Sequence, residues 1–326
     1  MKARLLITGA SGFIGYHLIQ SALQSGMEVD AAVRSSSKVD HLKGLDVNFV
    51  EFDFFDTDSI KKNFEKGQYD YIVHAAGVTK AHSFDDYVLA NVQSTANLAI
   101  AALEFPVKKF LFISSLAALG PIKYDDTSRI LETTAPNPVT NYGRSKLIAE
   151  NELIALDPLP WLIFRPTAVY GPRERDLLIM FKSLKRGLEP YIGHHVQSLS
   201  FLYVKDLASL TIKALKSSES RKIYNISDGH AYTQYDLANT IKKIMGRKTI
   251  KVHLPVPVVR VIAGVMESVG RNKTPALNVE KIKELTAENW SVNIEKAMHD
   301  LGYLPRYNLE AGIEETLEWY KQNNWL

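Results

Sequence analysis

The chain has 326 residues, of which 46% are hydrophobic and 23% are charged, so it is long enough to bury a large core in one composite domain or in two closely packed ones. Its net charge of +3 is spread over intermixed Lys, Arg, Asp and Glu, which excludes the basic stripe of a nucleic-acid-binding protein and favours a small anionic ligand. The absence of cysteine excludes disulfides, thiolate catalysis and Cys-ligated zinc.

The first expected strand begins by Leu5, which leaves no room for a signal peptide with its own apolar core and cleavage site. No apolar run reaches the roughly 18 residues that a membrane span needs. We therefore expect a cytoplasmic protein without a membrane partner.

Short apolar runs alternate with segments of helical apolar spacing through the first half of the chain. Such alternation predicts right-handed crossovers and an α/β fold with a doubly wound parallel sheet. The expected strands cover residues 5–8, 28–34, 47–56, 69–77, 107–115 and 160–171. The expected helices cover residues 13–23, 56–67, 87–105 and 141–156.

The remainder of the chain is less regular. Segments 201–216 and 222–228 could return the chain to the sheet. The stretch 254–270 carries prolines and an apolar stripe made of Val258, Val261, Ile262, Val265 and Val269. We interpret this stripe as one face of an amphipathic helix packed on a smaller domain, because its polar face is not notably basic; a pocket wall, a membrane surface and a partner surface stay open as alternatives.

The stretch LLITGASGFIG, residues 5–15, places three glycines at three-residue intervals between the first strand and the first helix. Glycine permits positive φ, lets the backbone approach a ligand and lets a helix pack closely on a strand, while free N–H groups at the helix N-terminus attract a pyrophosphate. The stretch therefore indicates a dinucleotide site. We assign residues 1–170, with about 198–228, to a dinucleotide-binding domain, and residues 171–197 and 229–326 to a substrate-binding part.

Further motifs follow this turn in a fixed order. The turn itself reads T-G-x-x-G-x-x-G, and after it come VHAAG at 73–77, NVQSTANL at 91–98, FISS at 112–115, YGRSK at 142–146, RPTAVYGP at 165–172, YVKDLA at 203–208 and LGYLP at 301–305. In these motifs the chain resembles the extended short-chain dehydrogenase/reductase superfamily, the branch of NAD-dependent epimerases, dehydratases and reductases. The resemblance covers nearly the whole chain. It implies a Rossmann fold and an enzyme that transfers hydride between a nicotinamide cofactor and a carbinol or carbonyl carbon.

Tyr142 and Lys146 are four residues apart on an expected helix, so their side chains share one face. A neighbouring ammonium stabilises a phenolate and lowers the phenol's pKa from its usual value of about 10, so Tyr142 is the predicted general acid/base. The resemblance implies that Lys146 also holds the nicotinamide ribose and that a serine after the fifth strand binds the reacting oxygen. Counting back five places from Gly120 selects Ser115 for this role, and we interpret Ser114 as a backbone-supporting neighbour.

The resemblance also implies which residues bind the cofactor. Asp53 matches the position that often binds the adenine amino group, with an N-cap or loop carboxylate as the alternative. Ala75, Ala76 and Gly77 are small residues that would let the cofactor approach the fourth strand. The predicted set is Gly9, Ser11, Gly12, Phe13, Ile14, Gly15, Arg34, Asp53, Phe54, Ala75, Ala76, Gly77, Tyr142, Lys146, Pro166 and Thr167.

Two further residues of these motifs are interpreted as structural. Asn91 matches an asparagine beside the active site, and His74 is interpreted as a hydrogen-bonded core histidine. No metal site is expected, because the nine histidines include no HExxH and no carboxylate cluster at ligand spacing. A nucleophile elbow is absent from the sequence as well, which excludes acyl-transfer hydrolysis.

The end of the second strand bears on the choice of nucleotide. An acidic residue there suits the ribose 2′-hydroxyl of NAD, whereas an arginine suits the 2′-phosphate of NADP. Val33 stands at the acidic position and Arg34 follows it. We therefore favour NADP over NAD, with a solvated surface charge as the alternative for Arg34.

The resemblance places the substrate between the C-terminal part and the loop after residue 172. Thr79 and Arg173 are the predicted substrate-binding residues, and the five Lys and Arg residues of 172–187 favour a phosphorylated substrate such as a nucleotide sugar. Dehydration is disfavoured, because Leu116 and Ala117 stand where dehydratases carry an Asp-Glu pair.

Epimerisation or reduction of a nucleotide sugar is thus ranked first. One alternative is NADP-dependent reduction of a small hydrophobic ketone or steroid-like substrate, for which residues 256–269 could form a pocket wall. The other is a non-catalytic nucleotide sensor. A homodimer without a nucleic-acid partner is expected.

Overall fold

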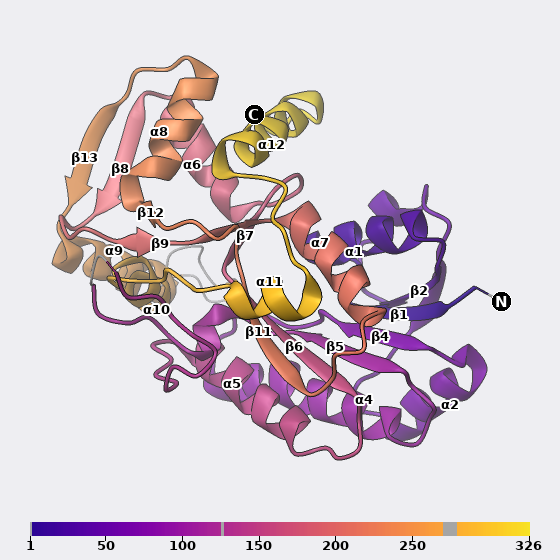
Figure 1. Cartoon of the computed structure of the whole chain (residues 1–326). Coiled ribbons are helices and arrows are strands. Elements are labelled where there is room, and N and C mark those ends of the chain that lie inside the picture. The colour runs from indigo at the N-terminus through magenta and orange to yellow at the C-terminus, as the bar shows by residue number, and fades with distance from the viewer. Residues whose placement is uncertain (1, 125–126, 270–278) are drawn as a thin grey trace.

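A computed structural model describes residues 2–124, 127–269 and 279–326 (Figure 1). Within these residues, seven parallel strands form one sheet in the order β11-β6-β5-β4-β1-β2-β3. The strand order reverses at β1, as it does in a doubly wound sheet, so the predicted fold class is confirmed. The strands are β1 (Arg4–Thr8), β2 (Glu28–Val33), β3 (Asn48–Glu51), β4 (Tyr71–His74), β5 (Lys109–Ile113), β6 (Trp161–Pro166) and β11 (Lys222–Ile226).

Helices cover both faces of this sheet (Figure 1). On one face Leu18 and Leu207 belong to a buried cluster with the apolar side chains of the strands, and on the other face Phe64 and Leu153 belong to a second cluster. The helices of the first face are α1 (Phe13–Gln24), α7 (Val204–Leu215) and α11 (Glu295–Leu301), and those of the second are α2 (Thr57–Gly67), α4 (Ser94–Ala102) and α5 (Asn141–Ile154). None of the helices that the structure describes has the length and hydrophobicity that a bilayer crossing requires.

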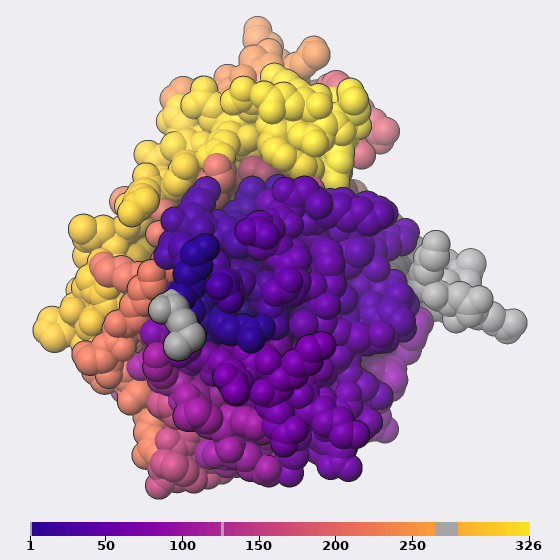
Figure 2. Space-filling model, turned by 90° about the vertical axis from the view of Figure 1, so that its right-hand side faces the viewer, coloured from indigo at the N-terminus to yellow at the C-terminus, as the bar shows by residue number. Residues whose placement is uncertain are grey.

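A smaller part adjoins the sheet and has its own core, in which Phe181, Tyr191, Ile241 and Ile313 are buried together. The C-terminal helix of this part lies against the N-terminal half of the chain, as the yellow and indigo surfaces of Figure 2 show. Its elements are β7 (Ala168–Tyr170), α6 (Asp176–Lys185), β8 (Leu188–Ile192), β9 (Ser198–Leu199), β10 (Phe201–Tyr203), β12 (Tyr232–Thr233), α8 (Gln234–Met245), β13 (Ile250–Leu254), α9 (Val256–Val269), α10 (Val279–Leu285) and α12 (Leu309–Gln322).

Two expected elements are interrupted. The expected strand over 160–171 divides into β6 and β7, because the chain leaves the main sheet after Pro166 and pairs β7 with β10. The expected helix over 87–105 consists of α3 (Phe84–Tyr87), the π-helical turn η2 (Val88–Gln93) and α4. A π-helical turn of this kind is often found at functional sites.

The apolar stripe expected on α9 does not pack against the smaller part as predicted. Val259 is buried, whereas Val258, Val261 and Ile262 are exposed. The prediction is wrong for these three residues, because α9 uses Val259 and the neighbouring Ala263 to contact α10. The side chains of residues 265 and 269 lie outside those that the structure describes.

Candidate active site

The three glycines of the first turn serve different purposes. Gly9 has a φ of +68°, and a Cβ on it would lie 2.6 Å from the backbone of Ala75. A Cβ on Gly15 would lie 2.2 Å from the Gly9 carbonyl oxygen, so Gly15 allows close packing of α1 on the end of β1. At Gly12 a Cβ would meet the Gly9 carbonyl oxygen at 3.1 Å and, among the described residues, no other atom within 4 Å. Gly12 therefore leaves its backbone open to a ligand.

Gly12 is also the N-cap of α1, beside a cleft of about 360 Å³. It supplies no side-chain cap, and the first turn of α1 contains no acidic residue. Four cations line the same cleft, Lys38, Lys80, Arg173 and Arg175, together with the carboxylates of Glu174 and Asp176. Free N–H groups at the positive end of a helix dipole, together with this excess of cations, suit a pyrophosphate.

Of the two predicted substrate-binding residues, Arg173 lies in this cleft with the glycine turn. Its φ is +79°, a backbone conformation that is uncommon for arginine. Its guanidinium carbon lies 4.6 Å from the ring centroid of Tyr16 on α1 and 5.8 Å from that of Trp319 on α12. Thr79 lines both this cleft and a second one that opens beside Tyr142.

The close packing of α5 on the turn after β5 brings Tyr142 and Ser115 together. A Cβ on Gly143 would lie 2.2 Å from the carbonyl oxygen of Ala117, so the short helix η3 (Leu116–Ala118) lies directly against α5. The Ser115 hydroxyl, which caps η3, is hydrogen-bonded to the Tyr142 phenol. The predicted acid/base and the predicted oxygen-binding serine thus form one constellation.

Lys146 is buried one helical turn after Tyr142. Its ammonium donates a hydrogen bond to the carbonyl oxygen of Ile113 at 2.9 Å and lies 4.2 Å from the ring centroid of Phe112. Burial lowers the pKa of Lys146 to about 7, although the carboxylate of Glu150 opposes this shift. The protein environment therefore disfavours the charged form of Lys146 when no ligand is bound.

Burial raises the pKa of Tyr142 to about 12. The hydrogen bond with Ser115 lowers it, and the charges of Glu284 and Tyr87 raise it further. The expectation that Lys146 lowers this pKa is not met in this arrangement, because its ammonium points to the Ile113 carbonyl oxygen. Tyr142 is therefore a neutral phenol at neutral pH, ready to donate a proton.

Ser114 has a different environment from Ser115. Its hydroxyl donates a hydrogen bond to Glu150 at 2.5 Å, and Glu150 pairs with Arg165 at 2.6 Å. All three side chains are buried. Ser114 thus joins β5, α5 and β6 through a buried ion pair, whereas Ser115 is only partly buried.

Asn91 and His74 are both held by internal hydrogen bonds. The Asn91 amide donates to Ser145 at 2.9 Å and to the Val78 carbonyl oxygen at 3.0 Å, and its oxygen accepts from the Val78 N–H at 2.7 Å. His74 contacts the hydroxyl of Thr8 at 2.7 Å, and burial lowers its pKa to about 3. Asn91 therefore fixes the loop after β4, while His74 is a neutral core residue.

The remaining predicted cofactor residues follow the carboxyl ends of neighbouring strands. Arg34 is exposed after β2, and Asp53 follows β3, where its carboxylate accepts a hydrogen bond from the Phe55 N–H at 2.9 Å. Thr167 follows β6, and its buried hydroxyl has no hydrogen-bond partner among the residues described. Ligands of doubly wound sheets bind at this edge. The residues placed there with them are Phe54, Ala75, Ala76, Gly77 and Pro166.

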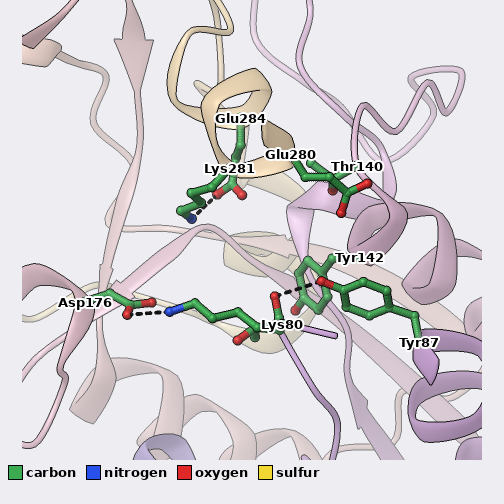
Figure 3. Close-up of a pocket in the computed structure, with 9 residues that line it drawn as sticks. Lys80, Tyr87, Thr140, Tyr142, Asp176, Glu280, Lys281 and Glu284 are labelled. Carbon is green, nitrogen blue, oxygen red and sulfur yellow. Dashed lines mark hydrogen bonds and ion pairs between the residues drawn. The ribbon is translucent and has the colours of Figure 1, made fainter. Parts of the chain in front are cut away.

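The second cleft, of about 180 Å³, lies beside Tyr142 (Figure 3). In Figure 3 the side chains of α10 lie on one side of the Tyr142 phenol, and Lys80 approaches from another. Lys80 pairs with Asp176 at 3.1 Å. The lining residues are Thr79, Lys80, Tyr87, Thr140, Tyr142, Asp176, Glu280, Lys281 and Glu284.

The contribution of α10 was not predicted from the sequence. Lys281 pairs with Glu284 at 2.8 Å, and Glu280 accepts a hydrogen bond from the N–H of Asn141 at 2.9 Å. Together with Lys80 and Asp176, these residues give the cleft two ammonium groups and three carboxylates. No motif of the sequence marks this short helix as part of the site.

The model of the NAD-dependent epimerase/dehydratase family matches residues 5–227. The chain belongs to this family. The chain is therefore an enzyme of the extended short-chain dehydrogenase/reductase type, as the motifs predicted. Within the ranges that the structure describes, no group of three or more His, Asp or Glu side chains could hold a metal ion.

The sequence matches to known relatives extend over almost the whole chain. It is 26% identical to a ceramide reductase of Caulobacter vibrioides, over 98% of this chain and 95% of that protein. It is 27% identical to a decarboxylating sterol-4-alpha-carboxylate 3-dehydrogenase of Candida albicans, over 98% of both. The structure of a UDP-glucose 4-epimerase from Thermotoga maritima has the same fold, with a TM-score of 0.80 at 22% identity over 98% of this chain and 99% of that one.

Proposed function

We propose that this enzyme is an NADP-dependent oxidoreductase that reduces a carbonyl group of an uncharged or cationic substrate with a hydrophobic portion. The observation that carries the proposal is the cleft beside Tyr142, in which a half-buried neutral phenol faces an excess of carboxylates. Such a cleft repels a diphosphate. The ceramide reductase and the sterol dehydrogenase named above also support a hydrophobic substrate.

The proposed chemistry uses Tyr142 as a general acid. The bound cofactor supplies the hydride that reduces the carbonyl carbon. Tyr142 donates its proton to the carbonyl oxygen, and the Ser115 hydroxyl holds that oxygen in place. A pKa of about 12 keeps the proton on Tyr142 at neutral pH, so Tyr142 is in the protonated form that a general acid for reduction needs.

Several features of the structure fit the dinucleotide. The open backbone at Gly12 and the uncapped start of α1 suit its pyrophosphate. The buried, unpartnered hydroxyl of Thr167 suits a hydrogen bond to the cofactor. A Cβ on Gly77 would lie 2.9 Å from Asn91 Oδ1 and 3.9 Å from Lys146 Nζ, so glycine keeps room beside Lys146. We propose that Lys146 holds the nicotinamide ribose and Asp53 the adenine.

The choice of NADP rests on Arg34. This exposed arginine follows β2, where its backbone N–H donates to the Ser37 hydroxyl at 3.0 Å. No acidic residue takes the position of Val33. Arg34 therefore suits a 2′-phosphate.

We predict that Arg34→Ala raises the Kd for NADPH by about tenfold or more, because a charge-assisted hydrogen bond is lost, and leaves the Kd for NADH unchanged. Isothermal titration calorimetry with both nucleotides measures this. Lys43→Ala, which removes an exposed cation further along the same connection, is the matched control. Equal affinity of the unmodified enzyme for NADH and NADPH would contradict the assignment.

Epimerisation of a nucleotide sugar is the second candidate. It is favoured by Lys80 and Lys281, whose ammonium groups reach the cleft. Both are paired with carboxylates in this structure. A diphosphate would have to displace Asp176 and Glu284 from them, so reduction of an uncharged or cationic carbonyl compound ranks first.

Redox stoichiometry on a substrate panel separates the two reactions. The panel contains a long-chain ketone, a 3-ketosteroid and UDP-glucose, and product is compared with NADPH consumed. One NADPH oxidised per product from a ketone, abolished in Tyr142→Phe, supports the proposal. Product from UDP-glucose without net cofactor change overturns it in favour of epimerisation.

We also propose the division into a dinucleotide-binding domain of residues 1–170 with about 198–228 and a substrate-binding part. The two proposed sites agree with it in part, since the glycine turn lies in the first unit and α10 in the second. The homodimer and the cytoplasmic location stay predictions from the sequence.

A further inference from the structure

A two-stranded parallel sheet of β8 and β13 stands at one end of the molecule, at the upper left of Figure 1. Its register pairs Leu188 with Ile250, so both side chains lie on the same face. Alternate positions along both strands continue that face. Its members are Leu188, Pro190, Ile192, Ile250, Val252 and Leu254, and every one of them is apolar.

The opposite face of the same two strands is packed against α8. Tyr191 makes an edge-to-face contact with Tyr235, with ring centroids 4.8 Å apart, and buried Glu189 pairs with Lys242 at 2.7 Å. The apolar face therefore turns away from the core. Leu188, Ile250, Val252 and Leu254 are exposed, Ile250 at 71%. This is the reverse of the usual arrangement, in which the apolar face of a sheet is covered.

The exposed apolar surface continues from β13 into α9. Val258, Val261 and Ile262 are exposed, with Val261 at 67%. Val259, on the other side of α9, packs against Ile282 of α10. We call the exposed side chains of β8, β13 and α9 the apolar end. Contiguous apolar patches of this kind mark interaction sites.

Charge around the apolar end is mostly positive. Residues 177–188 and 246–264 contain seven Lys or Arg and no Asp or Glu. The acidic residues of β8 and α9 are Glu189, which is buried and paired with Lys242, and Glu267. Arg186 and Lys248 stand exposed at the starts of β8 and β13, and Arg260 is exposed on α9. Cations beside exposed apolar side chains are typical of proteins that lie on anionic lipid surfaces.

We propose that the apolar end docks on the surface of a bilayer that contains anionic phospholipid. The apolar side chains enter the boundary between headgroups and acyl chains, and the flanking cations bind phosphate headgroups. A second copy of this chain fits less well, because a symmetric contact would bring two groups of like charge together. This proposal departs from the sequence-based expectation of no membrane partner.

Docking at this end would bring the substrate cleft close to the lipid. The helix that carries the exposed valines packs on α10, and α10 supplies Glu280, Lys281 and Glu284 to the cleft. A hydrophobic substrate could then reach Tyr142 from the bilayer. This last step rests on the proposed function, whereas docking itself does not.

Vesicle flotation tests the proposal with the full-length enzyme. The vesicles contain phosphatidylcholine alone, or equal parts of phosphatidylcholine and phosphatidylglycerol. The double variant Ile250→Asn/Val261→Asn removes two exposed apolar side chains outside both clefts. We expect the enzyme to bind the anionic vesicles and the double variant to bind them at least about tenfold more weakly, because partitioning depends on buried apolar area. Leu304→Asn, at 72% exposure outside the apolar end, is the matched control and should bind unchanged.

A charge variant and a test of oligomeric state complete the experiment. Lys248→Glu/Arg260→Glu should weaken binding to anionic vesicles by roughly fivefold or more per cation at low salt. Failure of the enzyme to bind anionic vesicles, or equal binding by all variants, overturns the proposal. So does a concentration-dependent dimer that Ile250→Asn/Val261→Asn dissociates while vesicle binding is absent. Turnover of a water-soluble ketone is measured in parallel, so that a failure of the proposed function is recognised separately.

Discussion

The Tyr142 hydroxyl holds its proton because the surrounding protein disfavours the phenolate more than Ser115 stabilises it. Tyr142→Phe removes this proton donor and leaves the ring in place. We expect kcat to fall by about 10²–10⁴-fold, the usual contribution of general acid catalysis, while NADPH binding is retained. Steady-state kinetics and calorimetry measure the two effects. A smaller loss of kcat would show that another group donates the proton.

Lys146 also makes the stability of the ligand-free enzyme depend on pH. Its pKa is lowered to about 7 in the folded state, against about 10.4 in an unfolded chain. Between these values the unfolded chain binds the extra proton, so the free energy of unfolding rises with pH, by at most about 1.4 kcal/mol per unit.

The corresponding experiment compares the enzyme with Lys146→Met. Urea unfolding from about pH 7.5 to about pH 9.5, the window set by the two pKa values, should show the rise in the unmodified enzyme and a flatter profile in the variant. Parallel profiles for both proteins would mean that Lys146 keeps its charge in the folded state.

At the scale of single elements, the glycines of the turn between β1 and α1 differ in the space that a side chain would have. A side chain on Gly12 would meet one backbone oxygen at 3.1 Å, whereas one on Gly15 would overlap that oxygen at 2.2 Å. Gly12→Val should weaken dinucleotide binding by about tenfold or more and change the melting temperature little. Gly15→Val should unfold or strongly destabilise the protein, because the strand and helix backbones must move apart.

Thermal melts and calorimetry on both variants check this prediction. Unchanged affinity of Gly12→Val for NADH and NADPH would remove the basis for placing the pyrophosphate at this turn. A Gly15→Val variant as stable as the unmodified enzyme would show that α1 can shift at little cost.

The elements of the main sheet could be predicted because their signals are local. Apolar runs marked the strands, and the glycine turn and the Tyr142/Lys146 pair each lie within one short segment. Which side of α9 is buried could not be predicted in the same way. Periodicity identified an apolar stripe, but which side of the helix meets α10 depends on tertiary packing of Val259 against Ile282. The alternation of side chains along β8 and β13, residues 188–192 and 250–254, likewise gives no sign of which face of this small sheet is covered.

At the scale of the whole molecule, the cleft beside Tyr142 joins parts that are far apart in the chain. Tyr142 comes from α5, while Glu280 and Glu284 come from α10. This juxtaposition is a property of the tertiary fold, and the sequence provided no motif for it. The placement of Arg173 illustrates the same limit, because Arg173 contacts Tyr16 and Trp319 and lines the cleft at the glycine turn, not the cleft beside Tyr142.

The charge of Glu284 provides a test of this long-range assembly. It raises the pKa of Tyr142, so Glu284→Gln should lower that pKa and move the alkaline limb of the kcat/KM profile for ketone reduction to lower pH. We expect a shift of less than about one pH unit, since the interaction acts at an effective dielectric well above that of a dry interior. Glu295→Gln, on α11 outside the cleft, is the matched control and should leave the profile unchanged. An unshifted limb in Glu284→Gln would mean that α10 does not lie beside Tyr142 during turnover, and the cleft as a substrate site would have to be abandoned.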